Sequence, residues 1–305
     1  MVIKSESSGA ERNVFVLSGG AARGAVQVGM MEVLLEHGIV PHALVGTSVG
    51  ALNAAFMGLR PDQLRVQELR ARWLRLGTQD IFPGGTLTRV GHLLRQRPYL
   101  FSSAALARLI ADWVPAELLE DLPTPVRIVT TPLAGNSAVY HRHGKLDQLL
   151  LASAAVPAIF APVTLPASSG FPGLHVDGGI SDLVPISGAA DLAPTRVFVL
   201  DASVPAQLPR GRTPVDILVA SLGVATRVRP EPDLGTMVAV HRMSTPDLGA
   251  RMTDFSYTAQ HIADGRTAAR RVVAEIAQAA LVTVERTVVP RRSSMRIWDR
   301  RSRTA

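Results

Sequence analysis

The stretch His42-Ala-Leu-Val-Gly-Thr-Ser-Val-Gly-Ala-Leu-Asn-Ala-Ala-Phe-Met57 joins two apolar segments through a turn that holds a serine between glycines. Residues 42–45 are typical of a buried strand and residues 49–57 of a helix. Between them, Gly46-Thr-Ser48-Val-Gly50 matches the G-x-S-x-G elbow in its strand-to-helix context. Only glycine fits beside so tight a turn, and the serine hydroxyl is presented at a helix N-terminus, which favours negative charge. Ser48 is therefore a candidate nucleophile; the alternative is a capping serine in a glycine-rich turn.

Apolar segments of both kinds continue on either side of this turn. Strands that alternate with helices predict an α/β fold with three layers, in which helices cover both faces of a mostly parallel central sheet. The loops Thr78–Pro98 and Pro162–Pro172 are rich in Gly, Pro and Ser and are candidates to cover a substrate cleft. The expected strands are Asn13–Leu17, His42–Val45, Pro125–Thr131, Ala138–His141 and Arg196–Leu200, and the expected helices are Ala25–His37, Val49–Met57, Pro61–Leu76, Ser103–Trp113, Leu146–Ser153, Val215–Arg227 and Ala268–Val288.

The composition fits one sizeable globular domain. The chain has 305 residues, 47% of them hydrophobic, and no break in composition. It has no cysteine, which excludes disulfides, thiolate metal sites and cysteine nucleophiles. The N-terminal residues 1–12 lack the apolar core of a secretory signal and are expected to be flexible. The longest charge-free stretch, Gln148–Leu174, contains four prolines. No membrane-spanning helix is therefore expected. The absence of cysteine fits a cytoplasmic location.

Most of the net charge of +7 lies in the C-terminal tail. Residues 291–305 hold six arginines and one aspartate, a net charge of +5, which leaves +2 for the rest of the chain. The nearly neutral body argues against nucleic acid as a partner. In the tail, arginines are mixed with Met295, Ile297 and Trp298, a composition that suits peripheral contact with an anionic membrane surface. The alternative is a disordered tail that only aids solubility.

A glycine-rich loop, Ser18-Gly-Gly-Ala-Ala-Arg-Gly24, directly follows the first expected strand. Paired glycines allow consecutive backbone N–H groups to turn toward one point, as an oxyanion requires. Arg23 either holds this loop in shape or meets a substrate phosphate. A dinucleotide-binding loop would need G-x-G-x-x-G, whereas the glycines lie at positions 19, 20, 24 and 29, and a P-loop would need G-K-[S/T] at its end. A phosphate or cofactor cradle and a purely structural turn are the alternatives.

An activated serine needs a base, and Asp177 is the candidate. It ends the short apolar strand His175-Val-Asp177 and precedes Gly178 and Gly179, which let another backbone approach closely. The alternative is an ordinary Asp-Gly turn. None of the eight histidines lies in a setting typical of a catalytic triad. His175 should nevertheless point to the same face of its strand as Asp177.

Together these motifs resemble the patatin-like phospholipase family in their order as well as their content. The resemblance covers residues 13–275. No counterpart is recognised for Thr78–Pro98, so the lid and the headgroup preference stay open. The segments that carry the resemblance are Gly19-Gly20-x-x-Arg23-Gly24, Gly46-x-Ser48-x-Gly50, Ala152-Ser153-Ala-Ala-Val-Pro157-Ala-Ile-Phe160-Ala-Pro162, Asp177-Gly178-Gly179 with Pro185, and Asp254-Phe255-Ser256 with Ile262-Ala-Asp-Gly265 and Ala268-Ala269-Arg270.

The resemblance implies a hydrolase domain over residues 13–290 with a serine–aspartate dyad and no histidine. Ser48 would be the nucleophile, and Asp177 the general base with a pKa raised by desolvation. Fatty acyl esters of phospholipids, lysophospholipids or neutral glycerides would be hydrolysed through an acyl-Ser48 intermediate. Neither a metal nor a cofactor is implied. The expected oxyanion hole is Gly19, Gly20 and Ala21, and the expected supporting residues are Arg23, Gly24, Gly46, Gly50, Gly178 and Gly179.

Two other functions are compatible with the same residues. An acyltransferase would pass the acyl group of the same intermediate to an alcohol. A lipid- or cofactor-binding protein would keep the fold without catalysis, although the intact Ser48, Asp177 and glycine loop argue against it.

Overall fold

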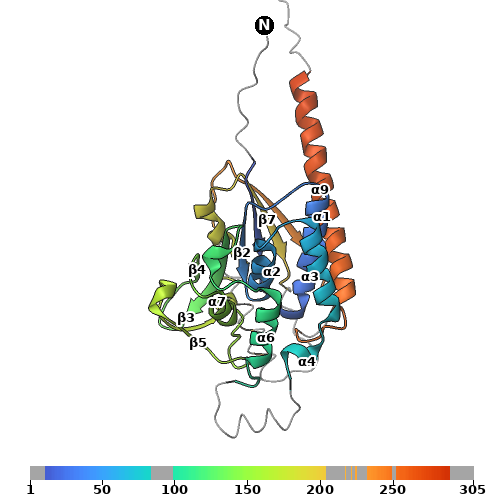
Figure 1. Ribbon diagram of the computed structural model, residues 1–305. Helices are drawn as coiled ribbons and strands as arrows, with labels where there is room; N and C mark the ends of the chain where they lie inside the picture. Colours follow the sequence, from blue (N-terminus) through green and yellow to red (C-terminus); the bar gives the residue numbers. More distant parts are fainter. Residues whose placement is uncertain are drawn as a thin grey trace, which may run out of the picture.

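An eight-stranded mixed sheet forms the centre of the protein in the computed structural model (Figure 1). The structure describes residues 11–83, 99–203, 232–248 and 252–288, with Ile217, Ser221 and Val224, and only the backbone of 282–288. The strand order is β5-β6-β3-β2-β1-β7-β8, and β4 pairs with β3. The neighbouring strands β3, β2, β1, β7 and β8 are parallel to one another, whereas β4, β5 and β6 form antiparallel pairs. The strands are β1 (Asn13–Leu17), β2 (Ala43–Thr47), β3 (Val126–Pro132), β4 (Val139–His141), β5 (Val163–Leu165), β6 (Gly173–Asp177), β7 (Arg196–Asp201) and β8 (Ala239–Ser244).

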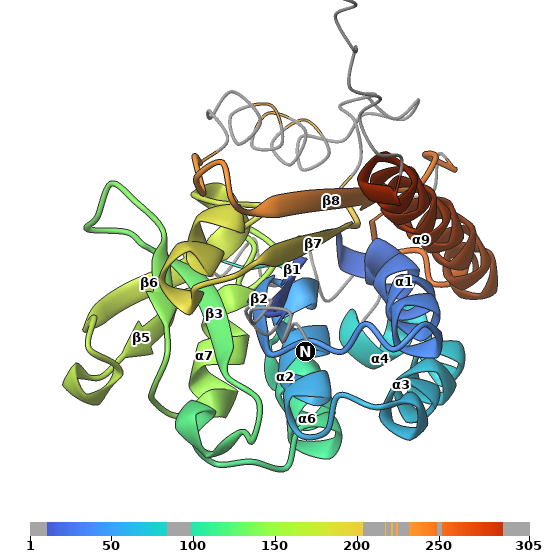
Figure 2. The same ribbon diagram turned by 90° about the horizontal axis from the view of Figure 1, so that it is seen from above.

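A layer of α-helices covers one face of the sheet (Figure 2). Strand β1 contributes Phe15 and Leu17 to the larger apolar core on that side. Its alternate residues, Val14 and Val16, enter a smaller core under the 3-10 helix η5 (Ile186–Leu192). The predicted α/β fold is confirmed. The α-helices are α1 (Ala25–Glu36), α2 (Val49–Gly58), α3 (Gln63–Arg75), α4 (Thr78–Ile81), α6 (Ala104–Trp113), α7 (Leu146–Ser153) and α9 (Thr258–Val288).

Helix α9 is longer than the sequence predicted, because it begins at Thr258 and not at Ala268. Glycine is a poor helix former, so Gly265 hides the first turns of the helix from sequence reasoning. A Cβ atom on Gly265 would lie 2.0 Å from the carbonyl oxygen of Val26 on α1, and Gly29 of α1 makes a reciprocal contact with α9. The two glycines are therefore needed where these helix backbones touch.

Strands β5 and β8 were not predicted. Most of β8 is exposed and β5 has only three residues, so neither has the apolar run typical of a buried strand. Other predictions lie outside the described residues. The tail 291–305 lies wholly outside them, and most of the N-terminal segment 1–12, the helix Val215–Arg227 and the loop Thr78–Pro98 does so as well.

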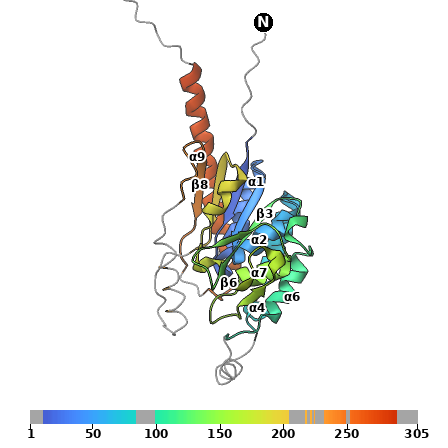
Figure 3. The same cartoon turned by 90° about the vertical axis from the view of Figure 1, so that its left-hand side faces the viewer.

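The two ends of the sheet carry different features. The carboxyl ends of β1 and β2 lead into the loop Ser18–Gly24 and into Ser48, and this end of the sheet lies toward α4 and α6 (Figure 1). Helix α9 starts near the same end and projects past the opposite one, as Figure 3 shows from the side. Its 31 residues correspond to about 46 Å of helix. The last turn of α9 is therefore remote from Ser48.

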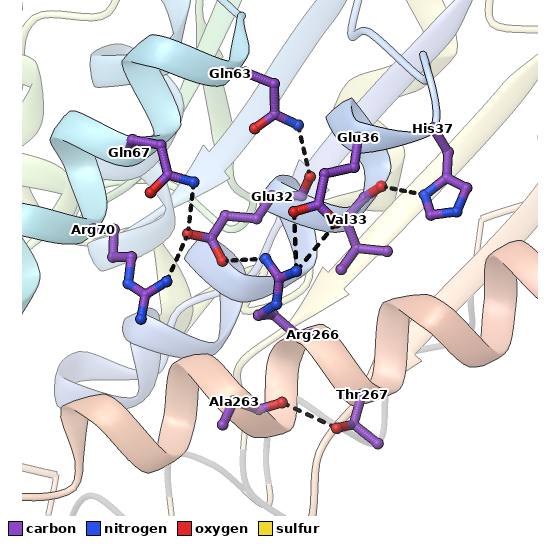
Figure 4. A network of polar contacts seen from close by, with 10 residues as sticks. All are labelled: Glu32, Val33, Glu36, His37, Gln63, Gln67, Arg70, Ala263, Arg266 and Thr267. Atoms are coloured by element: carbon purple, nitrogen blue, oxygen red, sulfur yellow. Dashed lines mark hydrogen bonds and ion pairs between the residues drawn. The ribbon is translucent and has the colours of Figure 1, made fainter.

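A buried carboxylate, Glu32, links α1 to both α9 and α3 (Figure 4). Arg266 of α9 forms an ion pair with Glu32 at 2.7 Å and a second with Glu36 at 2.9 Å. On the other side, Arg70 lies 3.5 Å from Glu32, and the Gln67 side chain donates a hydrogen bond of 3.3 Å to it. A carboxylate that is fully buried needs such partners, because an unpaired one would be strongly destabilising.

We expect Arg266→Met to lower the free energy of unfolding by about 2 to 4 kcal/mol, because Glu32 would lose its shorter ion pair while staying buried. Urea denaturation monitored by circular dichroism measures the change. Arg60→Met is the matched control, since Arg60 pairs with Asp62 on the surface and should matter by less than about 0.5 kcal/mol. Equal effects of the two substitutions would contradict the role given to Arg266.

Candidate active site

Ser48 occupies a sharp turn between β2 and α2. Its backbone has φ 55° and ψ −124°, a conformation that residues with a side chain rarely adopt and that costs about 1–3 kcal/mol. The flanking glycines are required by close packing. A Cβ on Gly46 would lie 2.4 Å from the carbonyl oxygen of Gly50, and a Cβ on Gly50 would lie 2.3 Å from that of Leu17. The turn thus has the geometry expected of a nucleophile elbow.

The hydroxyl of Ser48 donates a hydrogen bond of 2.6 Å to Oδ2 of Asp177. The two residues meet because β6 pairs with β3, which in turn pairs with β2. The other carboxylate oxygen of Asp177 accepts a 2.7 Å hydrogen bond from the N–H of Gly179. A Cβ on Gly178 would lie 2.3 Å from the carbonyl oxygen of Val129, so the chain after Asp177 lies directly against β3. The sequence-predicted nucleophile and base are therefore in direct contact.

Burial raises the pKa of Asp177 to about 6, although hydrogen bonds from Ser48 and Gly179 act in the opposite direction by stabilising the carboxylate. Only 4% of the residue is exposed. At neutral pH the carboxylate is mostly ionised, yet it is far more basic than an ordinary aspartate, whose pKa is about 3.9. Asp177 can therefore accept a proton from Ser48 at neutral pH.

Two buried histidines near this site are engaged elsewhere. The hydroxyl of Thr130 lies 2.8 Å from Nε2 of His141 and 2.8 Å from Nδ1 of His175. Nε2 of His175 also contacts the carbonyl oxygen of Phe171 at 2.9 Å. Burial lowers the pKa of His141 to about 4, so this ring is neutral at physiological pH. Within the described ranges, no hydrogen bond joins a histidine to Ser48 or Asp177.

The glycine loop lies beside Ser48, but its N–H groups are not equivalent. The N–H of Gly19 donates to the carbonyl oxygen of Leu183 at 2.9 Å. In the described part of the chain, the N–H groups of Gly20 and Ala21 donate to no protein acceptor. Ala21 and Ser48 also line the same cleft. Gly20 and Ala21 are therefore the loop residues that can still donate hydrogen bonds to a ligand.

Arg23, considered either as a support for this loop or as a contact for a substrate phosphate, makes hydrogen bonds within the protein. Its guanidinium is buried and donates to the carbonyl oxygen of Ala202 at 3.2 Å, to that of Pro246 at 3.1 Å and to the hydroxyl of Thr245 at 3.0 Å. With a longer contact of 3.5 Å to the carbonyl oxygen of Thr245, these hydrogen bonds to the loops that follow β7 and β8 use four of the five N–H donors of the guanidinium. Gly24 completes the packing, since a Cβ there would lie 2.5 Å from the side chain of Val49.

An apolar cleft opens beside Ser48. It lies between α2, α3, α4, α6, α7 and the segment before α9. Apart from the hydroxyls of Ser48 and Thr253 and the indole N–H groups, the side chains that line it are apolar. The lining side chains are Ala21, Ser48, Val49, Leu52, Trp73, Leu76, Ile81, Phe82, Leu106, Ile110, Trp113, Leu150, Ala154, Val156, Ile159, Phe160, Met252, Thr253 and Phe255. Such a cleft fits a long apolar chain whose polar end lies at Ser48.

Sequence reasoning did not assign this cleft, because its walls come from segments far apart in the chain and their apolar residues look like ordinary core. It also gave no role to Ser153, which the structure brings into contact with the backbone of Ser48. Among the described residues, no helix is long and apolar enough to cross a membrane, and no group of three or more acidic or histidine side chains is placed to hold a metal ion.

Comparison with known proteins agrees with this architecture. The family model described as patatin-like phospholipase matches residues 15–190, which is more than half of the chain. The sheet, the elbow and the covering helices therefore represent the patatin fold. The chain belongs to the patatin-like phospholipase family.

Individual relatives are distant and longer. A patatin-like phospholipase domain-containing protein of Caenorhabditis elegans is 28% identical over 186 residues, which are 61% of this chain and 13% of the relative. An uncharacterized NTE family protein of Mycobacterium tuberculosis is 27% identical over 189 residues, 62% of this chain and 48% of the relative. The chain thus spans less than half the length of these relatives. Among solved structures, VipD from Legionella pneumophila has a TM-score of 0.44 and 14% identity, with 88% of this chain and 68% of that chain covered.

We expect the carboxyl group of Asp177 to titrate at about pH 6, and Ser48→Ala to raise this pKa further because it removes a hydrogen bond that stabilises the carboxylate. Carbon-13 NMR of aspartate-labelled protein measures both values, and Asp177→Asn identifies the resonance. A titration near the ordinary value of about 3.9 would contradict the desolvated carboxylate.

Proposed function

We propose that the protein is a serine lipid acyl hydrolase that cleaves fatty acyl esters, with Ser48 as nucleophile and Asp177 as general base. The observation that carries the proposal is the 2.6 Å hydrogen bond from Ser48 to a buried carboxylate at the end of an apolar cleft. Phospholipids, lysophospholipids and neutral glycerides are the substrate class. The membership of the chain in the patatin-like phospholipase family supports this reading.

The proposed reaction has two steps. In the first, Asp177 accepts the proton of Ser48 while the serine oxygen attacks the ester carbonyl, and the alcohol leaves with that proton. In the second, Asp177 takes a proton from water, which attacks acyl-Ser48, and returns that proton to the Ser48 oxygen as the fatty acid leaves. The rate should fall as the pH drops through about 6, because a protonated Asp177 accepts no proton.

The carbonyl oxygen gains negative charge in each step and needs hydrogen-bond donors. Gly20 and Ala21 supply them in this proposal, because their N–H groups donate to no acceptor in the described chain. The N–H of Gly19, also expected in the oxyanion hole, already donates to Leu183. We therefore give Gly19 the role of holding the loop in position.

The cleft favours a fatty acyl group over a small polar substrate. Each methylene that leaves water for such a wall contributes about 0.8 kcal/mol. Arg23 does not bind a substrate phosphate in this proposal, since it is buried and most of its N–H donors are used by backbone carbonyls and a threonine hydroxyl. The acyl chain and not the headgroup is thus expected to supply most of the binding energy.

We also propose that the basic tail 291–305 binds anionic lipid and tethers the enzyme to a membrane. The helix that leads to it ends far from the cleft, so the tail would hold the enzyme near a membrane without aligning the cleft with the lipid surface.

Ser48→Ala and Asp177→Asn should each lower kcat for a soluble ester by about a thousandfold or more, and the double variant should lose little further, because the two residues act as a unit. Ester hydrolysis and labelling by a fluorophosphonate probe measure the effect. His175→Gln is the control, since His175 contacts Thr130 and not the pair, and it should keep most activity in folded protein. An active Asp177→Asn beside an inactive His175→Gln would replace the dyad with a serine–histidine arrangement.

Leu52→Trp should shift the substrate preference toward short acyl chains. Leu52 lies one turn after Ser48 on α2 and lines the cleft, so a larger ring there would fill the space next to the reacting carbon. The ratio of kcat/KM for a long-chain to a short-chain nitrophenyl ester should fall by about tenfold. Leu64→Trp, on the exposed side of α3, is the matched control. An unchanged ratio would show that the acyl chain binds elsewhere.

A further inference from the structure

The hydroxyl of Ser153, at the end of α7, connects two backbone groups next to the Ser48–Asp177 pair. It accepts a hydrogen bond of 2.9 Å from the N–H of Ser48 and donates one of 2.6 Å to the carbonyl oxygen of Val129 on β3. The residue is fully buried. It does not line the cleft, whereas the next residue, Ala154, does. Ser153 therefore contacts the elbow from behind and not from the side on which a substrate would bind.

We infer that Ser153 is a positioning residue for the proposed hydrolysis: its hydroxyl holds the backbone of Ser48 so that the serine oxygen stays on Asp177. The inference rests on the proposed function. Ser48 has a positive φ, and such a conformation persists only where its surroundings enforce it. Among the described residues, the Ser153 hydroxyl is the acceptor that the Ser48 N–H finds. Without that hydroxyl the N–H would be buried and unpaired, and the elbow could relax.

The same turn also holds the base. The N–H of Asp177 donates a 3.0 Å hydrogen bond to the carbonyl oxygen of Ala155, two residues after Ser153. The carbonyl of Val129, which accepts the Ser153 proton, lies directly against Gly178. Residues 153–155 thus contact the backbone of the nucleophile through a side chain and the backbone of the base through a carbonyl. The same short segment is therefore bonded to the backbones of both residues.

A further consequence concerns the oxyanion. Because the N–H of Ser48 is used by Ser153, it is not available to a substrate oxygen. The N–H that fixes the nucleophile is therefore that of Ser48, and different groups, the N–H groups of Gly20 and Ala21, would bind the developing charge.

The test compares Ser153→Ala with Ser169→Ala. Ser169 is also buried, and its hydroxyl also binds backbone groups: it lies 2.7 Å from the carbonyl oxygen of Pro166 and 3.2 Å from that of Phe171, and it accepts from the N–H of Phe171, but it has no contact with the pair. We expect Ser153→Ala to lower kcat for a soluble ester by about 10- to 100-fold with KM changed by less than about twofold, because small displacements of reacting groups have effects of this size. Fluorophosphonate labelling of Ser48 should slow in parallel, and Ser169→Ala should change neither.

A second readout separates positioning from a loss of stability. If the Ser48 oxygen moves away from Asp177, the carboxylate loses a hydrogen bond, and the acid limb of kcat/KM should move to higher pH in Ser153→Ala only. The role of Ser153 would be overturned if the acid limb did not move in Ser153→Ala and that variant were no less active than Ser169→Ala.

Two further variants keep the test decisive if Ser153→Ala does not fold. Ser153→Thr and Ser153→Val have nearly the same shape, but only threonine retains the hydroxyl. Threonine should be the more active by about tenfold or more, and equal activities in folded proteins would overturn the inference. Failure of the proposed function would look different: the wild type would neither hydrolyse esters nor react with the fluorophosphonate.

Discussion

The backbone conformation of Ser48 is the constraint on which the rest of the structure depends. A residue with a side chain holds a positive φ only where the surrounding backbone leaves no alternative. Here β1 passes so close to the start of α2 that Gly50 has no space for a Cβ atom, and Gly46 is confined in the same way by the first turn of α2. The parallel pairing of β1 with β2 thus brings the elbow beside the glycine loop. The order of the strands determines which groups surround the serine.

The proposed base illustrates a balance between two opposing effects. Burial makes the Asp177 carboxylate more basic, whereas hydrogen bonds from Ser48 and Gly179 make it less so, and the net pKa is about 6. Stronger hydrogen bonding would lower the pKa and make the carboxylate too weak a base, whereas deeper burial would raise the pKa and leave the carboxyl group protonated at neutral pH. Histidine is not needed for this balance, and the two buried histidines nearby are bound to Thr130 instead.

The sequence predicted what depends on local pattern. The elbow, the glycine loop and the Asp-Gly-Gly turn are short motifs in which tight packing requires glycine at neighbouring positions. All three lie where they were expected relative to strands and helices. The contacts that depend on the tertiary fold were not readable. Ser153 looks like any serine at a helix end, Gly19 looks like its neighbour Gly20, and β8 has no apolar run. The first turns of α9 were also missed, because the close contact of Gly265 with α1 needs the residue that helices otherwise avoid.

In the proposed reaction, backbone N–H groups bind the oxyanion, and this explains how the cleft can be apolar. The N–H groups of Gly20 and Ala21 need no polar side chain to bind an oxyanion, and Arg23 stays behind the loop, bound to carbonyl oxygens. Ser48 is then the boundary between the apolar cleft on one side and the buried carboxylate on the other. An acyl chain that fills the cleft would also exclude water from that boundary. Substrate binding would therefore strengthen the hydrogen bond on which proton transfer depends.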